Sequence, residues 1–224
     1  MIEILHHQLA ITSPGSLQDS FDFFHKGGKF MIPLAITSVA GMMTIVYKLL
    51  SLSGKRVIPS QLASDVARYG ELIDARKVEP VLREFEKGES ALARLGAVVI
   101  KHHGKTRGEI THAVESAAKI ETLHLYAGIT VLDTVITIAP LLGLLGTASG
   151  LVLIFQGLGD NSDHLAIARG IAEALTTTIF GLAIAVPCVV AHGYFVRRIE
   201  LLTARLETLL SDLAFACEHT NKSY

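Results

Sequence analysis

The sequence is poor in the residues that mark secreted domains and nucleic-acid-binding proteins. It has no tryptophan and two cysteines in 224 residues, and its 20 Lys and Arg balance its 21 Asp and Glu. Two cysteines provide neither a disulfide framework nor a metal cluster, and the absence of a basic excess argues against a nucleic-acid partner. Cys188 lies in an apolar run and is interpreted as a small core residue.

Motifs of catalysis and export are also missing. The sequence contains no nucleophile elbow, phosphate-binding loop or HExxH pair, so it gives no support to an enzyme. None of the ten histidines has a partner at metal-ligand spacing within an apolar segment, so neither a metal nor another cofactor is expected. The first residues, Met1 to His7, lack the basic start and apolar core of a secretory signal. The first long apolar segment is therefore expected to stay as an anchor.

The abundant feature is hydrophobic sequence. Half of all residues are hydrophobic, and about 20 mostly apolar residues suffice for a helix to cross a bilayer. Three segments qualify, at 30–47, 127–159 and 170–196. Lys29 and Lys48 flank the first, which is the shortest and has a buried soluble helix as its alternative. The second is uncharged from Thr134 to Gly159, and the third carries one charge, Glu173. Because backbone groups in lipid must bond within their own segment, the sequence predicts an all-α membrane protein with three transmembrane helices.

Basic residues predict the orientation of these helices. The pair Arg197-Arg198 follows the third segment directly, and Lys and Arg are frequent in the long middle segment. Such residues favour the cytoplasmic side of a membrane. We therefore expect the N-terminal segment and the loop between the last two spans to be periplasmic, with the middle segment and the C-terminal helix in the cytoplasm. These four regions are 1–29, 160–169, 48–126 and 197–224.

The regions outside the spans are expected to be helical. The middle segment is rich in Glu, Lys, Arg and Ala, which predicts helices broken at Gly70, Gly88 and Gly104. After the third span, apolar residues alternate steps of three and four, as in a coiled-coil seam. The seam consists of Ile199, Leu202, Leu206, Leu209, Leu213 and Ala216. We therefore expect the second and third spans to extend into a cytoplasmic helical bundle. In the N-terminal segment Ser16 is placed to cap a short interfacial helix, with a disordered tail as the alternative.

The second span presents one small and polar face. Its members, at helical spacing, are Pro140, Gly143, Thr147, Gly150 and Ile154. Gly146 and Gly150 form a GxxxG pair, and small residues let helices in lipid approach closely, so plain packing is the simpler interpretation of the glycines. Two interpretations of Thr147 stay open. Its hydroxyl either bonds back to its own helix or faces a partner or a wet path as donor and acceptor.

The third span carries an acidic residue and three threonines. It begins Gly170-Ile171-Ala172-Glu173-Ala174-Leu175-Thr176-Thr177-Thr178 and continues through Gly181 and Pro187. An ionisable residue in a span is a functional candidate, although Glu173 lies near the outer end, where water reaches it. Thr178 shares a small face with Gly181. Two spans that each present a small face with one hydroxyl predict a narrow polar path. Asp133, beside the second span, is interpreted as an interfacial solvated carboxylate rather than a mid-membrane proton site.

These residues resemble the signatures of the ExbB/TolQ/MotA proton-channel family. The run Ala139-Pro140-Leu141-Leu142-Gly143-Leu144-Leu145-Gly146-Thr147, followed by Gly150, is similar to the second-span signature. The residues from Gly170 to Pro187 are similar to the third-span signature. Gly27-Gly28 ahead of the first span fits the ExbB-like branch, and three spans favour that branch over the flagellar stators, which usually have four. The resemblance covers essentially the whole chain.

The resemblance implies a homo-pentamer in the inner membrane of a Gram-negative bacterium. Its pore encloses a single-span subunit, similar to ExbD or TolR, that carries an intramembrane aspartate. The complex uses the proton-motive force to drive a TonB-like energy transducer that serves outer-membrane transport, or, in a TolQ-like role, envelope integrity. A non-conducting membrane scaffold is the alternative. No cofactor is implied.

The resemblance also implies roles for individual residues. The proton-path hydroxyls fall on Thr147 and Thr178, and the third-span glutamate falls on Glu173. Thr176 and Thr177 replace residues that are usually more apolar, so which threonine faces the pore stays open. Asp133 stands where a small or apolar residue is common. The residues expected to pack helices at the pore are Pro140, Gly143, Gly146, Gly150, Gly181 and Pro187.

Overall fold

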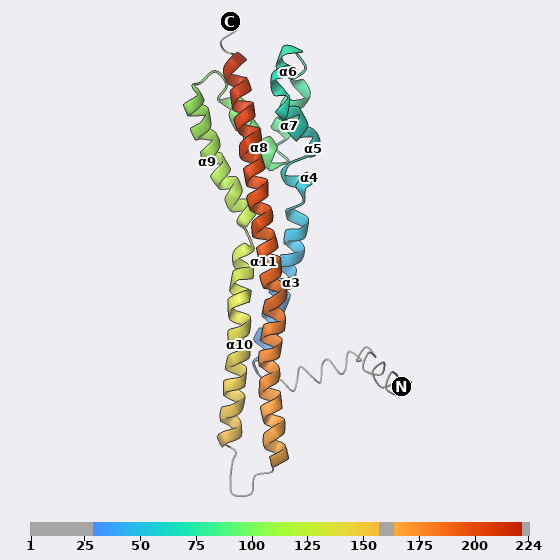
Figure 1. Cartoon of the computed structure of the whole chain (residues 1–224), viewed down its shortest axis with the longest axis vertical. Coiled ribbons are helices and arrows are strands. Elements are labelled where there is room, and N and C mark those ends of the chain that lie inside the picture. The colour runs from blue at the N-terminus through green and yellow to red at the C-terminus, as the bar shows by residue number, and fades with distance from the viewer. Residues whose placement is uncertain (1–28, 157–163, 221–224) are drawn as a thin grey trace, which may run out of the picture. The chain divides into compact units, whose positions relative to one another are not determined.

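The computed structural model describes residues 29–156 and 164–220, and it is helical with short connections and no strand in these two stretches (Figure 1). The expected all-α class is confirmed. The interfacial helix expected near Ser16 lies outside the described residues. The helices are α3 (Met31–Ser51), α4 (Gly54–Val57), α5 (Ser60–Ala67), α6 (Tyr69–Asp74), α7 (Glu79–Lys87), α8 (Ala91–Lys101), α9 (Arg107–Tyr126), α10 (Ile129–Gln156) and α11 (His164–Thr220).

Three helices of the described chain are long and apolar enough to cross a membrane. They are α3, α10 and the part of α11 from Ile167 to Cys217. Large apolar side chains cover their surface, such as Leu153 at 66% exposed and Ile179 at 65%. Side chains of this kind are expected to face lipid, because a bilayer core is as apolar as they are. The prediction of three spanning helices is confirmed.

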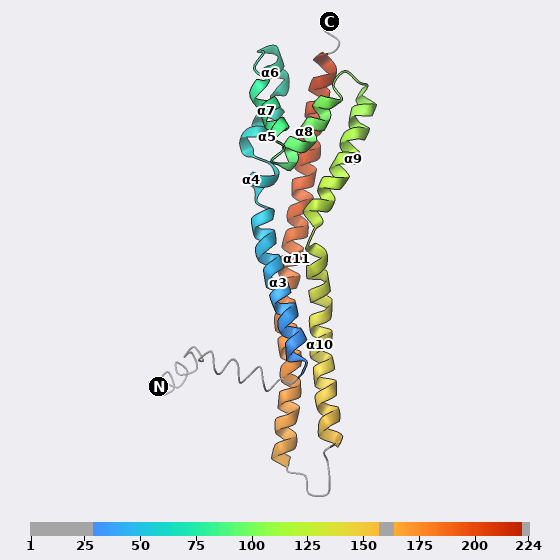
Figure 2. The same ribbon diagram turned by 180° about the vertical axis from the view of Figure 1, so that it is seen from behind.

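The chain folds as two compact units. The first unit contains the residues up to Gly41 together with Thr134–Pro187. Within it, α10 and the first part of α11 run antiparallel and side by side, with the start of α3 against them (Figure 2). Its small core holds Met31, Leu34 and Ala139, all at most 2% exposed.

The second unit contains Met42–Asp133 and the chain from Cys188 onward. It holds α4 to α9 and the rest of α11, and its core is built from larger apolar side chains such as Leu92 and Val99, both fully buried. Every expected member of the α11 seam is buried except Ala216, which is half-buried. The expectation that the third span continues as one helix is confirmed, since α11 is uninterrupted over 57 residues.

Glycine ends a helix here only where the backbone needs a positive φ. Gly88 follows α7 with φ +61°, and Gly104 lies between α8 and α9 with φ +84°. The predicted break at Gly70 was wrong, because Gly70 lies inside α6 and the interruption falls at Arg68, one residue before that helix. A helix tolerates an interior glycine at a cost of roughly 1 kcal/mol, so glycine alone does not mark a helix end.

The ends of the spanning helices also differ from expectation. The loop expected at 160–169 is too long, because α11 begins at His164 and good helix formers such as Leu165 and Ala168 continue it. The helix of the first span runs past Tyr47 to Ser51. The second begins at Ile129 rather than at residue 127, since Gly128 at φ +85° separates α9 from α10.

Candidate functional site

The site begins with a close approach of two backbones in the first unit. A Cβ built on Gly181 of α11 would lie 2.5 Å from the carbonyl oxygen of Ala139 on α10. A Cβ on Gly143 would lie 2.9 Å from both the carbonyl oxygen of Thr177 and the Cα of Thr178. These separations are too short for any side chain. Glycine at these positions therefore lets the two helices touch through their backbones, which is how helices pack where lipid provides no hydrophobic drive.

The GxxxG pair continues the same contact along α10. A Cβ on Gly146 would lie 2.5 Å from Oγ1 of Thr177, and a Cβ on Gly150 would lie 2.8 Å from Cβ of Ala174. The two glycines thus receive the side chains of α11. Close helix packing describes all four glycines of this contact, and their place beside a pore stays a prediction.

Thr147 and Thr178 meet across this contact. Their Oγ1 atoms lie 3.5 Å apart. The Thr147 hydroxyl donates to the carbonyl of Leu144 at 2.7 Å, and the Thr178 hydroxyl lies 3.0 Å from the carbonyl oxygen of Gly143. Thr147 is 8% exposed and Thr178 is half-buried. The interpretation that the Thr147 hydroxyl bonds back to its own helix is confirmed. A hydroxyl that donates its single proton keeps lone pairs as acceptors, so a role of Thr147 toward a polar partner stays a prediction.

The other two threonines of the run have different partners, although the Thr177 hydroxyl also lies 3.1 Å from the carbonyl oxygen of Gly143. Thr177 is 2% exposed and donates to the carbonyl of Ala174 at 2.8 Å, within the glycine contact. Thr176 donates to the carbonyl of Ala172 on its own helix, also at 2.8 Å. Of the three, Thr178 is the one whose hydroxyl reaches Thr147. This order follows from helix geometry, in which neighbouring side chains point about 100° apart.

The remaining predicted site residues lie outside this contact. Glu173 is exposed, while its neighbour Ala174 packs on Gly150, so the carboxylate lies on a side of α11 that α10 leaves uncovered. Pro140 is half-buried inside α10, and Pro187 is exposed inside α11. The structure therefore brings Thr147 and Thr178 together with the glycines and keeps Glu173 on another face.

Sequence reasoning missed a pair between α10 and α11 in the second unit. Nε2 of His192 lies 2.9 Å from Oδ1 of Asp133, and their side chains are 28% and 58% exposed. A signal for this pair exists in the sequence. Facing positions of two antiparallel helices advance in opposite directions along the chain, and Asp133 precedes Thr147 by as many residues as His192 follows Thr178. A Thr147–Thr178 pairing thus predicts that Asp133 and His192 face each other.

Lys48 was expected only as a basic flank of the first span, and the structure gives it a fixed position. Its side chain is 1% exposed, and Nζ donates to the carbonyl oxygen of Leu125 at 2.7 Å. Leu125 lies in the last turn of α9, where free carbonyls and the helix dipole attract a cation. Lys48 therefore joins the end of α3 to the end of α9 within the second unit.

An ion pair fixes α9 to α8 in the same unit. Arg94 donates two hydrogen bonds to the carboxylate of Glu121, at 2.6 and 2.7 Å, and a third to the carbonyl of Gly88 at 3.0 Å. Glu121 is 8% exposed. The hydrogen bond to Glu121 raises the pKa of the Arg94 guanidinium. Bidentate geometry of this kind sets orientation as well as energy.

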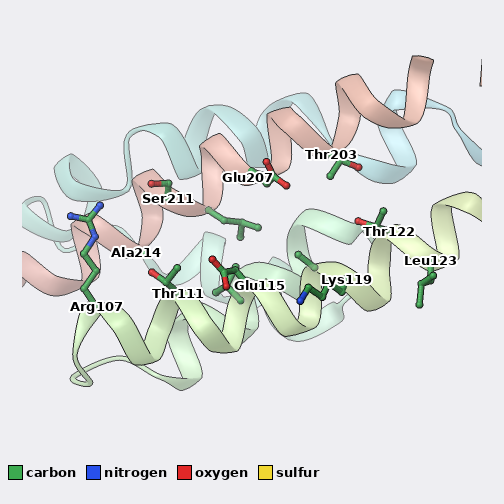
Figure 3. A pocket seen from close by; sticks show the side chains of 13 residues that line it. Arg107, Thr111, Glu115, Lys119, Thr122, Leu123, Thr203, Glu207, Ser211 and Ala214 are labelled. Atoms are coloured by element: carbon green, nitrogen blue, oxygen red, sulfur yellow. The ribbon is translucent and has the colours of Figure 1, made fainter. Parts of the chain in front are cut away.

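A groove of about 890 Å³ lies between α9 and α11 (Figure 3). Figure 3 shows hydroxyls, apolar side chains and charges of both signs around it. Oγ1 of Thr203 in its wall is buried and has no hydrogen-bond partner. None of the path residues predicted from the sequence belongs to this lining, which consists of Arg107, Thr111, Val114, Glu115, Ala118, Lys119, Thr122, Leu123, Thr203, Glu207, Leu210, Ser211 and Ala214.

Comparison with known proteins assigns this chain to a family. Residues 80–208 match the MotA/TolQ/ExbB proton channel family. The chain is 31% identical over 180 residues to a putative biopolymer transport protein ExbB homolog of Methanothermobacter thermautotrophicus, an alignment that covers 80% of this chain and 63% of that protein. It is 33% identical over 172 residues to the putative biopolymer transport protein ExbB-like 1 of Synechocystis, covering 74% of this chain and 66% of that protein.

A TolQ protein also matches this chain. The chain is 35% identical over 105 residues to the Tol-Pal system protein TolQ of Pseudomonas aeruginosa, which is 46% of each chain. The chain spans about two thirds of the length of the first two relatives. The expected resemblance is confirmed: the chain is a multi-pass membrane protein that belongs to the MotA/TolQ/ExbB proton channel family, with ExbB-like relatives.

Proposed function

We propose that this chain is the proton-path subunit of a membrane complex that couples the proton-motive force to mechanical work, in an ExbB-like role. The observation that carries the proposal is the pair of Thr147 and Thr178 hydroxyls, 3.5 Å apart on two helices long enough to span a bilayer. Both lie at the glycine contact that brings those helices together. Membership of a proton channel family supports protons as the transported ion.

The chemistry of a hydroxyl suits a path that protons visit. A threonine hydroxyl donates to a carboxylate and accepts from a carboxylic acid, so it supports an acidic partner in either protonation state. In the proposal that partner is an aspartate on the single transmembrane helix of an ExbD- or TolR-like subunit, where low dielectric favours the protonated acid. The membrane potential supplies about 2.3 kcal/mol per charge per 100 mV to drive the transfer.

The proposed assembly is a homo-pentamer whose pore encloses that helix. Thr147 and Thr178 line the pore, and Gly143, Gly146 and Gly181 hold their helices in contact beside it. The absence of side chains at these glycines supports this arrangement, since a Cβ at any of them would strike the facing helix. Glu173, exposed near one end of α11, is placed where water enters the path.

The proposed location is the inner membrane of a Gram-negative bacterium. The Arg197-Arg198 pair supports a cytoplasmic C-terminus and a periplasmic N-terminus. In this orientation the second unit stands in the cytoplasm, and the work is delivered across the periplasm to a TonB-like transducer of outer-membrane transport. A TolQ-like role in envelope integrity is the second candidate, and the match to a TolQ protein favours keeping it.

Substitution of the two threonines by valine tests the proposal. Valine keeps the shape and removes the hydroxyl, so Thr147→Val and Thr178→Val leave packing nearly intact while they remove the polar groups. We expect proton uptake into liposomes containing the full complex to fall on the order of 100-fold in the double variant, as when a positioned proton-transfer group is removed. Thr176→Val is the matched control, because it makes the same change on α11 at a hydroxyl that donates to Ala172 and lies outside the proposed path. Unchanged uptake in the double variant would indicate a passive scaffold.

A further inference from the structure

We propose that Asp133 and His192 form a second proton-binding site of this chain, which exchanges protons with water at the Asp133 end of α10. The site rests on the proposed function, since it serves the same proton path. It uses residues that lie outside the threonine pair and the glycine contact. The juxtaposition that carries it is an imidazole and a carboxylate joined across two spanning helices at 2.9 Å.

The position of the pair along the helices sets it apart from surface ion pairs. His192 follows a run without charge from Ala174 to Ala191, and Asp133 directly precedes the uncharged part of α10 that begins at Thr134. Polar groups in such stretches are expensive and are kept near one another or near a water-filled space. The two helices therefore place their ionisable groups together, where the apolar part of each helix ends.

A tether between helices does not require a histidine. Two neutral side chains that hydrogen-bond would hold α10 against α11 equally well. Histidine is the side chain whose charge changes between pH 5 and 8, and a neighbouring carboxylate stabilises the imidazolium form. The side chain of Asp133 is 58% exposed and that of His192 is 28% exposed, so the carboxylate reaches outward while the imidazole sits between the helices. The pair thus combines a partly exposed carboxylate with an imidazole, the side-chain type that most often carries protons in proteins.

Several other charged groups of the second unit have contacts of their own. On α3, Lys48 donates to the carbonyl of Leu125. On α9, Glu121 binds Arg94, and on α11 the Arg197 guanidinium lies 3.4 Å from the Glu200 carboxylate. Arg198 lies beside α4, with Nη2 3.5 Å from a Cβ built on Gly54. The His192 imidazole faces Asp133 across the two helices at 2.9 Å.

The transfer itself is a simple proton exchange. The neutral imidazole of His192 takes one proton from a hydronium ion and becomes an imidazolium, leaving one water molecule. The Asp133 carboxylate stabilises this cation through the hydrogen bond between the two groups. The imidazolium then gives the proton to a water molecule of the path and returns to its neutral form. No other bond forms or breaks, and the reverse order carries a proton outward.

The experiment uses the full-length chain in the complex isolated from its own membranes and reconstituted in liposomes. A trapped pH-sensitive dye reports proton uptake driven by a potassium diffusion potential, between pH 5 and 8. His192→Gln is the central variant, because the glutamine amide still donates to Asp133 but does not titrate. We expect uptake to fall about 100-fold and to lose its pH dependence in this range, the lower end of the effect of removing a positioned proton-transfer group. His112→Gln is the matched control, since His112 lies 3.8 Å from Glu115 on the exposed surface of α9.

The exchange variant Asp133→His with His192→Asp separates titration from folding. It keeps one imidazole and one carboxylate between the same helices, and we expect it to restore uptake and its pH profile. Wild-type uptake and pH profile in His192→Gln would overturn the inference and leave a structural tether. Loss of uptake in the threonine double variant, with His192→Gln normal, would overturn the inference and keep the proposed function. A wild-type complex that carries no protons would overturn both.

Discussion

The two units of this chain pack their helices by opposite means. In the first unit, α10 and α11 meet at glycines so closely that a Cβ on Gly181 would lie 2.5 Å from a backbone oxygen. In the second unit, α11 buries large side chains such as Ile199 and Leu213, both fully shielded from solvent. The same helix thus changes from a small-residue contact to a leucine-rich seam along its length.

The solvent explains the difference. Lipid tails are as apolar as leucine, so burying leucine between spanning helices gains little, and backbone contact and hydrogen bonds must hold them together. In water, burying apolar surface stabilises the folded state by roughly 25 cal/mol per Å². We therefore expect the switch in packing along α11 to mark where the chain leaves the bilayer. Three substitutions test this comparison.

Leu213→Ala is expected to have the largest effect. Leu213 is fully buried in the second unit, and its truncation removes apolar contacts and leaves a cavity. We expect a loss of about 3 kcal/mol in the free energy of unfolding, measured by circular dichroism of the full chain in detergent during denaturant titration. Leu201→Ala, at a position 51% exposed on the same helix, is the control. Equal losses in both variants would contradict a buried seam.

Gly181→Ala should act through overpacking instead of a cavity. The added methyl group meets the carbonyl oxygen of Ala139 and forces α10 and α11 apart, at a cost of about 2 kcal/mol. The measurement is resistance of the full chain to unfolding in a sodium dodecyl sulfate titration. Gly193→Ala serves as control, because a Cβ there meets nothing within 4 Å. Alanine in an open helical position stabilises by about 0.5 kcal/mol or more, so the two substitutions should have opposite signs.

The smallest effect on stability is expected at alkaline pH, from Tyr69 in the second unit. Tyr69 is 5% exposed, and burial, followed by the charge of Cys217, raises its pKa to about 12. The unfolded phenol ionises near pH 10, so the folded state loses stability as the pH rises from about 10 toward 12, while nothing changes below pH 10. We expect about 1 kcal/mol of this loss by pH 11, and Tyr69→Phe should remove it. Thermal unfolding at a series of pH values provides the measurement, and the same alkaline slope in both proteins would contradict the burial of this phenol.

Sequence patterns predicted the parts of the fold that depend on one helix at a time. The uncharged runs predicted the spanning helices, and the three-and-four spacing of Leu202, Leu206 and Leu209 predicted the buried seam. These patterns work because each residue's burial follows from its position around a single helix axis. The break predicted at Gly70 failed because glycine is permitted inside a helix and is needed only where φ is positive.

Features that depend on two helices escaped prediction. The sequence could not decide among Thr176, Thr177 and Thr178, because the choice depends on how α10 lies against α11. The bonds of Lys48 to Leu125 and of His192 to Asp133 join residues far apart in the chain, and helical periodicity carries no information about such partners. Asp133 lies as many residues before Thr147 as His192 lies after Thr178. This equal spacing predicts the His192–Asp133 pair only once the Thr147–Thr178 pair is known.

Pro187 gives α11 a property that neither unit has by itself. It is the last residue of the first unit, inside a helix that continues through Cys188 into the second. Proline has no N–H to donate to the carbonyl four residues earlier, that of Ala183. The helix α11 therefore lacks one backbone hydrogen bond at this point. A helix bends most easily where its ladder of backbone hydrogen bonds is interrupted. We therefore expect α11 to be more elastic at Pro187 than along the rest of its length.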